Sequence, residues 1–231
     1  MKKFIFDVHG TLISNRKKIE REFLTAFLIF CRHHDVYLVT GSNREKTIYL
    51  LGIDAYYSVK RVYNCSGCDV YERDINVYRD TWKPSDEVRQ FLQHELDHIK
   101  FKLGTDPYIE ERPGCIIFSI LGRGADWKER EEYKEHDKEE HEKIGKRFTQ
   151  RFPDLYDTSG GQTGLAIAPL GRDKSQILRD FKEDDELHFF GDRIKEGGND
   201  HFLALEIEKR CGFVYNVEDY IQTWELLSKY D

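Results

Sequence analysis

The chain has 231 residues, 39% of them hydrophobic, so it can bury a core in one large domain or in two unequal ones. Its formal net charge of −7 argues against nucleic acid or an anionic membrane as the main partner, because such partners need a basic surface. The apolar run at 23–30 is too short to span a bilayer, the N-terminus lacks a signal-peptide pattern, and the 5 cysteines are scattered. These features predict a reduced, cytoplasmic protein without a membrane partner.

Four short apolar runs predict buried strands, at 3–7, 36–40, 187–192 and 212–217. Nearly every residue in them is apolar, as in a parallel sheet that helices cover on both faces. The segment 18–31 between the first two runs is expected to be a helix. The alternation of strands and helices therefore predicts an α/β fold with right-handed crossovers.

A second helix is expected directly after the run at 36–40. Ser42 and Glu45 have the spacing of a capping box at its start, and Gly52 suits its end.

Residues 81–168 differ from the rest of the chain in their pattern of expected helices and strands. They begin with a helical pattern at 86–101, continue with two strand-like runs around Pro113 and Gly114, and end in a very charged helical pattern at 126–152. Helices and a hairpin that interrupt a parallel-sheet pattern predict an inserted α+β domain. The expected core then consists of 1–80 and 169–231.

Polar residues stand at the ends of three predicted strands, namely Asp7, Thr40 and Asp192. In open α/β sheets, ligands bind beyond the carboxyl ends of the strands. These three side chains are therefore expected to converge, although they lie far apart in the sequence.

The residues around Asp7 suit phosphoryl transfer. A carboxylate at the end of a strand, followed by a glycine turn, can attack a phosphoryl group and form an aspartyl-phosphate. Such chemistry needs Mg²⁺, for which Asp192, Asn199 and Asp200 offer oxygen ligands. Lys174 can neutralise the phosphoryl oxygens.

Several motifs resemble those of the haloacid dehalogenase (HAD) superfamily: D-x-x-G-T at 7–11, T-G-S at 40–42, D-K-S at 173–175 and G-G-N-D at 197–200. The stretches FDVHGTLISNRKKI, RPGCIIFSILGR, SGGQ and FFGDRIKEGGND, in this order, resemble eukaryotic-type phosphomannomutases more closely. The resemblance implies a Rossmann-like HAD core with a parallel sheet and an inserted cap for specificity and dimerisation. It also implies an aspartyl-phosphate, Mg²⁺, a phosphosugar substrate, a bisphosphorylated hexose activator and a homodimer.

The resemblance also assigns roles to residues of the predicted core. Asp7 resembles the nucleophile, and Asp192 resembles a metal ligand. The implied metal site comprises the side chains of Asp7, Asp192, Asn199 and Asp200 and the backbone carbonyl of His9. Thr40, Ser42 and Lys174 resemble the phosphate-binding residues.

Four arginines match substrate-binding positions of the family. Arg16 follows the first motif, and Arg112, Arg123 and Arg130 match cap arginines that grip the distal phosphate and the sugar. A planar guanidinium suits phosphate because it can donate two parallel hydrogen bonds.

The chain departs from the family pattern at three positions. His9 stands where the family has an aspartate that acts as general acid and base, and Gly164 and Ala166 replace a serine and an aspartate that hold sugar hydroxyls. Imidazole has an ordinary pKa near 6.5 and can exchange protons at neutral pH, so His9 is expected to be catalytic. The alternative is that His9 weakens the site and leaves a protein that only binds a phosphorylated ligand.

The expected activity is an Mg²⁺-dependent transfer of phosphoryl groups on a phosphorylated sugar. It is most like a phosphomannomutase, which converts mannose 6-phosphate to mannose 1-phosphate. The alternative enzyme is a sugar-phosphate phosphatase, because water that reaches the aspartyl-phosphate turns transfer into hydrolysis.

Two further motifs have metal-like spacing but are expected to be structural. HELDH at 94–98 places His94 and His98 one helical turn apart, yet it also fits an amphipathic helix and has no third ligand nearby. C-x-x-C at 65–68 has no second pair of cysteines to complete a zinc site.

Overall fold

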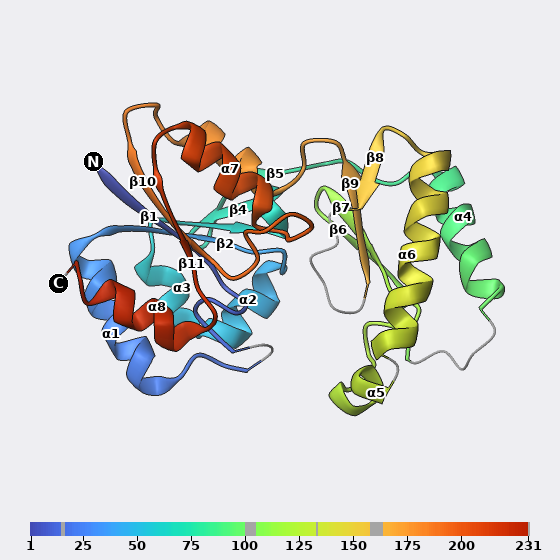
Figure 1. Cartoon of the computed structure of the whole chain (residues 1–231), viewed down its shortest axis with the longest axis horizontal. Coiled ribbons are helices and arrows are strands. Elements are labelled where there is room, and N and C mark those ends of the chain that lie inside the picture. The colour runs from blue at the N-terminus through green and yellow to red at the C-terminus, as the bar shows by residue number, and fades with distance from the viewer. Residues whose placement is uncertain (15–16, 100–104, 133, 158–163, 231) are drawn as a thin grey trace. The chain divides into compact units, whose positions relative to one another are not determined.

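The computed structural model of the chain describes residues 1–14, 17–99, 105–132, 134–157 and 164–230 (Figure 1). It contains two compact units, the first formed by Met1–Arg79 and Gly171–Asp231 and the second by Asp80–Leu170. Among the described residues, no helix is long and apolar enough to cross a membrane. The role of the second unit as a cap stays a prediction.

A largely parallel seven-stranded sheet forms the first unit, which confirms the α/β fold class (Figure 1). Its strands, in spatial order, are β11 (Phe213–Asn216), β10 (Glu186–Gly191), β1 (Lys2–Asp7), β2 (Asp35–Val39), β3 (Arg61–Asn64), β4 (Asp69–Glu72) and β5 (Ile75–Arg79). The first five are parallel, and β4 and β5 add an antiparallel hairpin at one edge. All four predicted strands are present.

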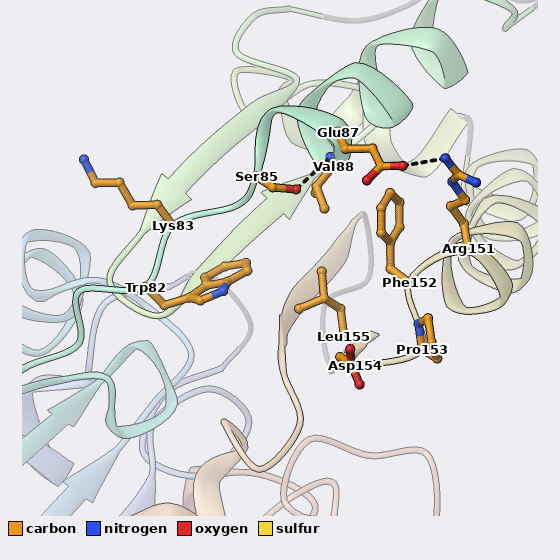
Figure 2. A pocket seen from close by; sticks show the side chains of 10 residues that line it. All are labelled: Trp82, Lys83, Ser85, Glu87, Val88, Arg151, Phe152, Pro153, Asp154 and Leu155. Carbon is orange, nitrogen blue, oxygen red and sulfur yellow. Dashed lines mark hydrogen bonds and ion pairs between the residues drawn. The ribbon is translucent and has the colours of Figure 1, made fainter.

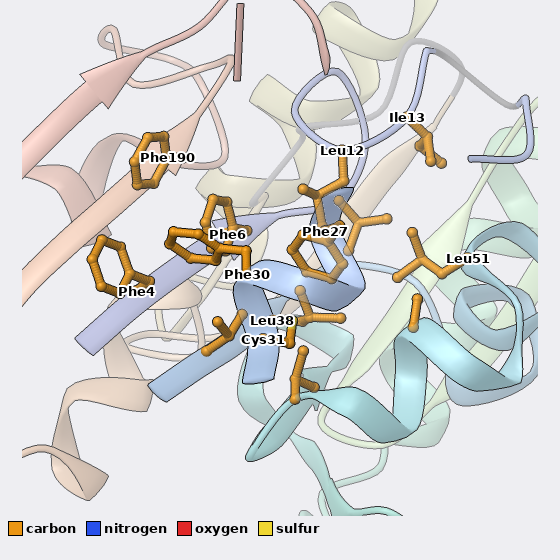
Figure 3. Close-up of a cluster of buried hydrophobic side chains, with 14 of the residues drawn as sticks. Phe4, Phe6, Leu12, Ile13, Phe27, Phe30, Cys31, Leu38, Leu51 and Phe190 are labelled. Carbon is orange, nitrogen blue, oxygen red and sulfur yellow. The ribbon is translucent and has the colours of Figure 1, made fainter. Parts of the chain in front are cut away.

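Helices cover both faces of this sheet because the side chains of its central strands alternate between two apolar layers. Phe4 and Phe6 of β1 point to one layer, where α1 (Arg21–His33), α3 (Ile53–Ser58) and α8 (Tyr220–Leu227) pack. Figure 3 shows this cluster, in which the Phe6 ring stacks on Phe190 of β10 with ring centroids 4.7 Å apart. Burial of each phenylalanine side chain stabilises the folded state by roughly 1.5–3 kcal/mol.

The opposite layer packs against α7 (His201–Lys209) and a 3₁₀ segment, Lys174–Asp180. Ile5 of β1 contributes to this layer, between Phe4 and Phe6 of the other one. Two helices, α2 (Arg44–Leu51) and α3, follow β2 and are separated by Gly52. The φ of 81° at Gly52 explains why the helix predicted after β2 ends there.

The second unit has a four-stranded antiparallel sheet in the order β6 (Ile109–Arg112), β7 (Cys115–Phe118), β9 (Leu165–Pro169) and β8 (Leu155–Asp157). Its helices are α4 (Asp86–Asp97), α5 (Trp127–Glu132) and α6 (Lys134–Arg151). The hairpin predicted around Pro113 and Gly114 is confirmed by the pairing of β6 with β7. Apolar residues of α4 and α6 pack on Ile116 and Phe118 of β7.

A buried histidine lies within the main sheet, where His188 of β10 pairs with Phe4 of β1. The ring of His188, on β10, stacks between the rings of Phe4 and Phe213, with centroids 4.9 and 4.8 Å away. Its Nε2 lies 2.9 Å from Glu186 Oε1, and its Nδ1 lies 3.1 Å from the hydroxyl of Tyr215. A neutral imidazole satisfies both contacts if Nε2–H donates to the carboxylate and Nδ1 accepts from the tyrosine.

The contribution of His188 to stability is expected to fall when the pH drops below about 6.5. Burial lowers the pKa of His188, Lys2 lowers it further, and the Glu186 carboxylate only partly opposes them. Between the folded and unfolded pKa values the unfolded chain binds more protons, so acid favours unfolding. Between pH 7.5 and 5.5, acid is expected to lower the thermal midpoint of His188→Phe less than that of wild type, and the exposed His33→Gln is expected to follow wild type. Equal slopes for His188→Phe and wild type would contradict this.

Candidate active site

Asp7 and Lys174 form a buried ion pair at the carboxyl end of β1. Lys174 Nζ donates to Asp7 Oδ1 over 2.6 Å and to Asp200 Oδ1 over 2.7 Å. The three side chains come from the end of β1, the start of the 3₁₀ segment and the residue before α7. All are almost fully buried, so the lysine charge balances part of the negative charge of the two aspartates.

Asp192 brings a third carboxylate to the same place, directly after β10. Oxygen atoms of Asp7, Asp192 and Asp200 all lie within 4.8 Å of one another. Glycine permits this approach, since a Cβ on Gly10, whose φ is 79°, would lie 2.3 Å from Asp192 Oδ2. A Cβ on Gly191 would lie 2.9 Å from Asp200 Oδ2. At Gly10 and Gly191, any residue larger than glycine would therefore collide with a carboxylate, which explains the glycines of the D-x-x-G and G-D motifs.

The carboxylates carry more negative charge than the lysine offsets. Burial raises the pKa of Asp7 to about 8, although Lys174 opposes the shift, and Asp200 and Asp192 add to it. Burial, with a contribution from Asp200, also raises the pKa of Asp192 to about 6. Burial alone would lower the pKa of Lys174, but Asp200 and Asp7 raise it above its ordinary value. A further cation would relieve this repulsion.

The donor set fits a hard divalent cation. Three carboxylates converge, and the buried Oδ1 of Asn199 has no hydrogen-bond partner within the described part of the chain. A buried amide oxygen without a partner is unfavourable unless a water or an ion completes its contacts. Carboxylate and amide oxygens are the ligands that Mg²⁺ prefers. The expected role of the His9 carbonyl as a further ligand stays a prediction.

His9, Thr40 and Ser42 lie together beside the aspartates. Ser42 N donates to Thr40 Oγ1 over 3.1 Å, and His9 Nε2 lies 2.9 Å from Ser42 Oγ. The expectation that Ser42 caps the next helix is wrong: the side chain of Asn43 accepts from Lys46 N over 3.0 Å and forms the cap. Ser42 is held in the preceding loop instead, where its hydroxyl meets His9.

A tight turn at Cys65–Gly67 supports this loop. Cys65 N donates to Ser42 O over 2.9 Å, and Ser66 N donates to Thr40 O over 2.8 Å. Gln176 Nε2, from the 3₁₀ segment of Lys174, donates to Ser66 O over 2.8 Å. The turn therefore ties the Thr40 loop to the Lys174 segment. The sequence did not predict these hydrogen bonds. They depend on the positive φ values of Cys65 and Ser66, 48° and 56°, which such residues rarely adopt.

The three predicted arginines of the second unit lie close together in that unit. Arg112 Nε and Arg123 Nε donate to the same carboxylate, Glu110, over 2.7 and 3.0 Å. Arg130 is buried, and its guanidinium donates to the carbonyls of Ala125, Gly122 and Arg123. Substrate binding by these arginines stays a prediction. Arg16 lies outside the described residues.

The two other metal-like motifs have structural contacts. Glu95 of the HELDH motif forms an ion pair with Arg147, and His98 Nδ1 lies 2.7 Å from the His94 carbonyl oxygen. Neither His94 nor His98 belongs to a potential metal-binding group within the described ranges. The CSGC segment forms the turn at Cys65–Gly67.

A separate pocket of about 330 Å³ lies in the second unit, at the start of α4 (Figure 2). Trp82 and Phe152 contribute aromatic surface, and the ion pair of Glu87 with Arg151 crosses one side. None of the predicted site residues lines this pocket.

Comparison with known proteins identifies the family of the chain. The family model for eukaryotic phosphomannomutase matches residues 36–228. The phosphomannomutase of Triticum aestivum is 31% identical over 220 residues, which cover 90% of this chain and 87% of the relative. That of Oryza sativa subsp. indica is 30% identical over 227 residues, covering 93% and 90%.

Solved structures show the same fold at low identity. A haloacid dehalogenase-like hydrolase from Bacteroides thetaiotaomicron has a TM-score of 0.67 at 12% identity, covering 100% of this chain and 99% of its own. A HAD subclass IIB sugar phosphatase has a TM-score of 0.61 at 14% identity, covering 100% and 99%. The sequence matches assign the chain to a family, and the solved structures share its fold: the chain is an enzyme that belongs to the eukaryotic phosphomannomutase family.

Proposed function

We propose that this enzyme moves a phosphoryl group between two hydroxyls of a phosphorylated sugar, with Asp7 as the nucleophile. The observation that carries the proposal is the 2.6 Å contact between Asp7 and the buried Lys174 at the end of β1, with Asp192 and Asp200 beside it. The names of its relatives favour mannose 6-phosphate and mannose 1-phosphate as substrate and product.

The first step forms a phosphorylated enzyme. A carboxylate oxygen of Asp7 attacks phosphorus, and the bond from phosphorus to the sugar oxygen breaks with its electron pair on that oxygen. His9 donates a proton to this oxygen, which makes it a better leaving group. Lys174 balances the negative charge of the transferring group. Mg²⁺, held by Asp7, Asp192, Asp200 and Asn199, would supply further positive charge at the phosphoryl oxygens.

The second step runs the same chemistry from another position of the sugar. A different hydroxyl attacks the phosphoryl group, gives its proton to His9 and releases the Asp7 carboxylate. The contact of 2.9 Å between His9 Nε2 and Ser42 Oγ supports this role, because it places the imidazole beside a residue that is proposed to bind a phosphoryl oxygen. Thr40 holds the Ser42 backbone in place.

Fewer residues of this chain indicate which sugar is bound than indicate the phosphoryl-transfer chemistry. A Cβ on Gly164 would lie 2.7 Å from the Phe118 carbonyl oxygen, so the family's serine would not fit there without movement of the backbone. Incubation with Mg²⁺ and a panel of sugar phosphates tests the function if free phosphate and phosphosugar isomers are both followed. Isomers without phosphate support the mutase, phosphate alone indicates a phosphatase, and neither product indicates a binding protein.

Asp7→Asn is expected to lower turnover at least about 100-fold and to abolish the acid-stable phosphoenzyme, because an amide is not a nucleophile for phosphorus. Turnover and radiolabel retention after acid quench measure the two effects. The exposed Asp54→Asn serves as the matched control and is expected to behave like wild type. Substantial turnover by Asp7→Asn, with deamidation excluded by mass spectrometry, would remove Asp7 from its role.

Mg²⁺ is expected to raise the thermal midpoint of the protein, because an ion that binds only the folded state stabilises it. At a concentration 100 times Kd the gain is about 2.7 kcal/mol. Differential scanning fluorimetry with and without MgCl₂ measures the shift. Asp192→Asn is expected to lose most of it and the exposed Asp184→Asn to keep it. The same shift in both variants would place the ion elsewhere.

His9→Ala is expected to slow turnover of a sugar phosphate by about 10²–10⁴-fold, the usual worth of a positioned proton donor. Hydrolysis of p-nitrophenyl phosphate should fall far less, because its leaving group needs no proton. The comparison of the two substrates is the measurement, with the exposed His33→Ala as control. If His9→Asp instead raises turnover on the order of 10²-fold, His9 blocks the site and the chain as given is a binding protein.

A further inference from the structure

Glu110 lies between two of the arginines that are proposed to bind the substrate. Its Oε1 accepts from Arg112 Nε over 2.7 Å, and its Oε2 accepts from Arg112 Nη2 over 2.8 Å and from Arg123 Nε over 3.0 Å. The first arginine is on the same strand, β6, and the second is in the loop after β7. One carboxylate therefore joins two segments of the second unit and fixes the spacing of two guanidinium groups.

The backbone that carries Arg123 is already held by other contacts. Arg123 N donates to Pro107 O over 2.8 Å, and the buried Arg130 donates to the carbonyls of Gly122 and Arg123, each over 3.0 Å. A Cβ on Gly122 would lie 1.8 Å from Thr105 O, so this loop fits closely against its neighbour. These contacts fix the backbone of Arg123 but not the direction of its long side chain. The ion pair with Glu110 sets that direction.

The charges favour the same role. Burial would raise the pKa of Glu110, but the two arginines lower it, so the carboxylate is ionised at neutral pH. The ionised carboxylate can therefore hold both guanidinium groups by charge-assisted hydrogen bonds. An arginine held in place loses less side-chain entropy when it binds an anion than a mobile one does.

The neighbouring residue provides a natural comparison. Glu111 is also on β6 and also forms an ion pair with an arginine, Arg89 Nε, over 2.8 Å. That pair joins β6 to α4 and is more exposed than the Glu110 cluster. The two glutamates are thus alike in chemistry and strand, but only Glu110 contacts Arg112 and Arg123.

We propose that Glu110 is a positioning residue for substrate binding: it holds Arg112 and Arg123 side by side so that together they bind one phosphate group of a phosphorylated hexose. This inference rests on the proposed function.

Calorimetric titration with glucose 1,6-bisphosphate tests the proposal in the full chain carrying Asp7→Asn, which stops turnover. Relative to this parent, Glu110→Gln is expected to weaken binding about tenfold, because its neutral amide gives up the charge-assisted bonds that orient the arginines. Arg112→Ala is expected to weaken binding at least as much, and Glu111→Gln is expected to leave it unchanged. Thermal midpoints are measured for every variant.

Each other outcome has a distinct meaning. Unchanged affinity in Glu110→Gln together with weaker binding in Arg112→Ala overturns the positioning role but leaves the proposed function intact. Tighter binding in Glu110→Gln overturns it as well, because Glu110 would then compete with the phosphate. A lower thermal midpoint without a change in affinity shows a purely structural role and also overturns it. Failure of the parent to bind the bisphosphate defeats the proposed substrate class, and the inference with it.

Discussion

The contact of one buried lysine with two buried aspartates is the interaction on which the site depends. Lys174 reaches Asp7 and Asp200, and these three residues come from three separate parts of the chain. A buried aspartate without such a partner would be strongly unfavourable, so the end of β1, the 3₁₀ segment and the start of α7 are tied to a common position. The parallel sheet makes this possible, because β1 and β10 end at the same edge and deliver Asp7 and Asp192 side by side.

The supporting residues show how the loops at this edge are kept in register. Thr40 and Ser42 lie on a loop whose carbonyl groups accept hydrogen bonds from the turn at Cys65–Gly67. Gln176 connects that turn to the segment of Lys174. These links are hydrogen bonds of 2.8–3.1 Å. The proposed proton donor His9 joins the same network through Ser42, so its position depends on contacts far from it in the sequence.

Sequence patterns predicted the parts of this protein that depend on local chemistry. The four apolar runs predicted β1, β2, β10 and β11, and the polar residues at their ends led to Asp7 and Asp192 without reference to any structure. By contrast, β5 was missed, because it is an exposed edge strand without an apolar run. Ser42 was misassigned as a cap, since the sequence spacing suits it but the hydrogen bonds of the fold favour Asn43. Glu110 has no local signal at all, because only the fold brings Arg123 to it.

In each unit, one charged side chain contacts two side chains of the opposite charge. In the first unit one cation, Lys174, is shared by carboxylates; burial, with contributions from Asp200 and Asp192, raises the pKa of Asp7, and the cluster of carboxylates suits a metal ion. In the second unit one anion, Glu110, is shared by the guanidinium groups of Arg112 and Arg123, which are proposed to bind a phosphate. The substrate proposed above, a phosphorylated sugar that binds together with Mg²⁺, carries charges of both signs. The charges of each unit, taken by itself, are therefore consistent with a phosphorylated rather than a neutral sugar.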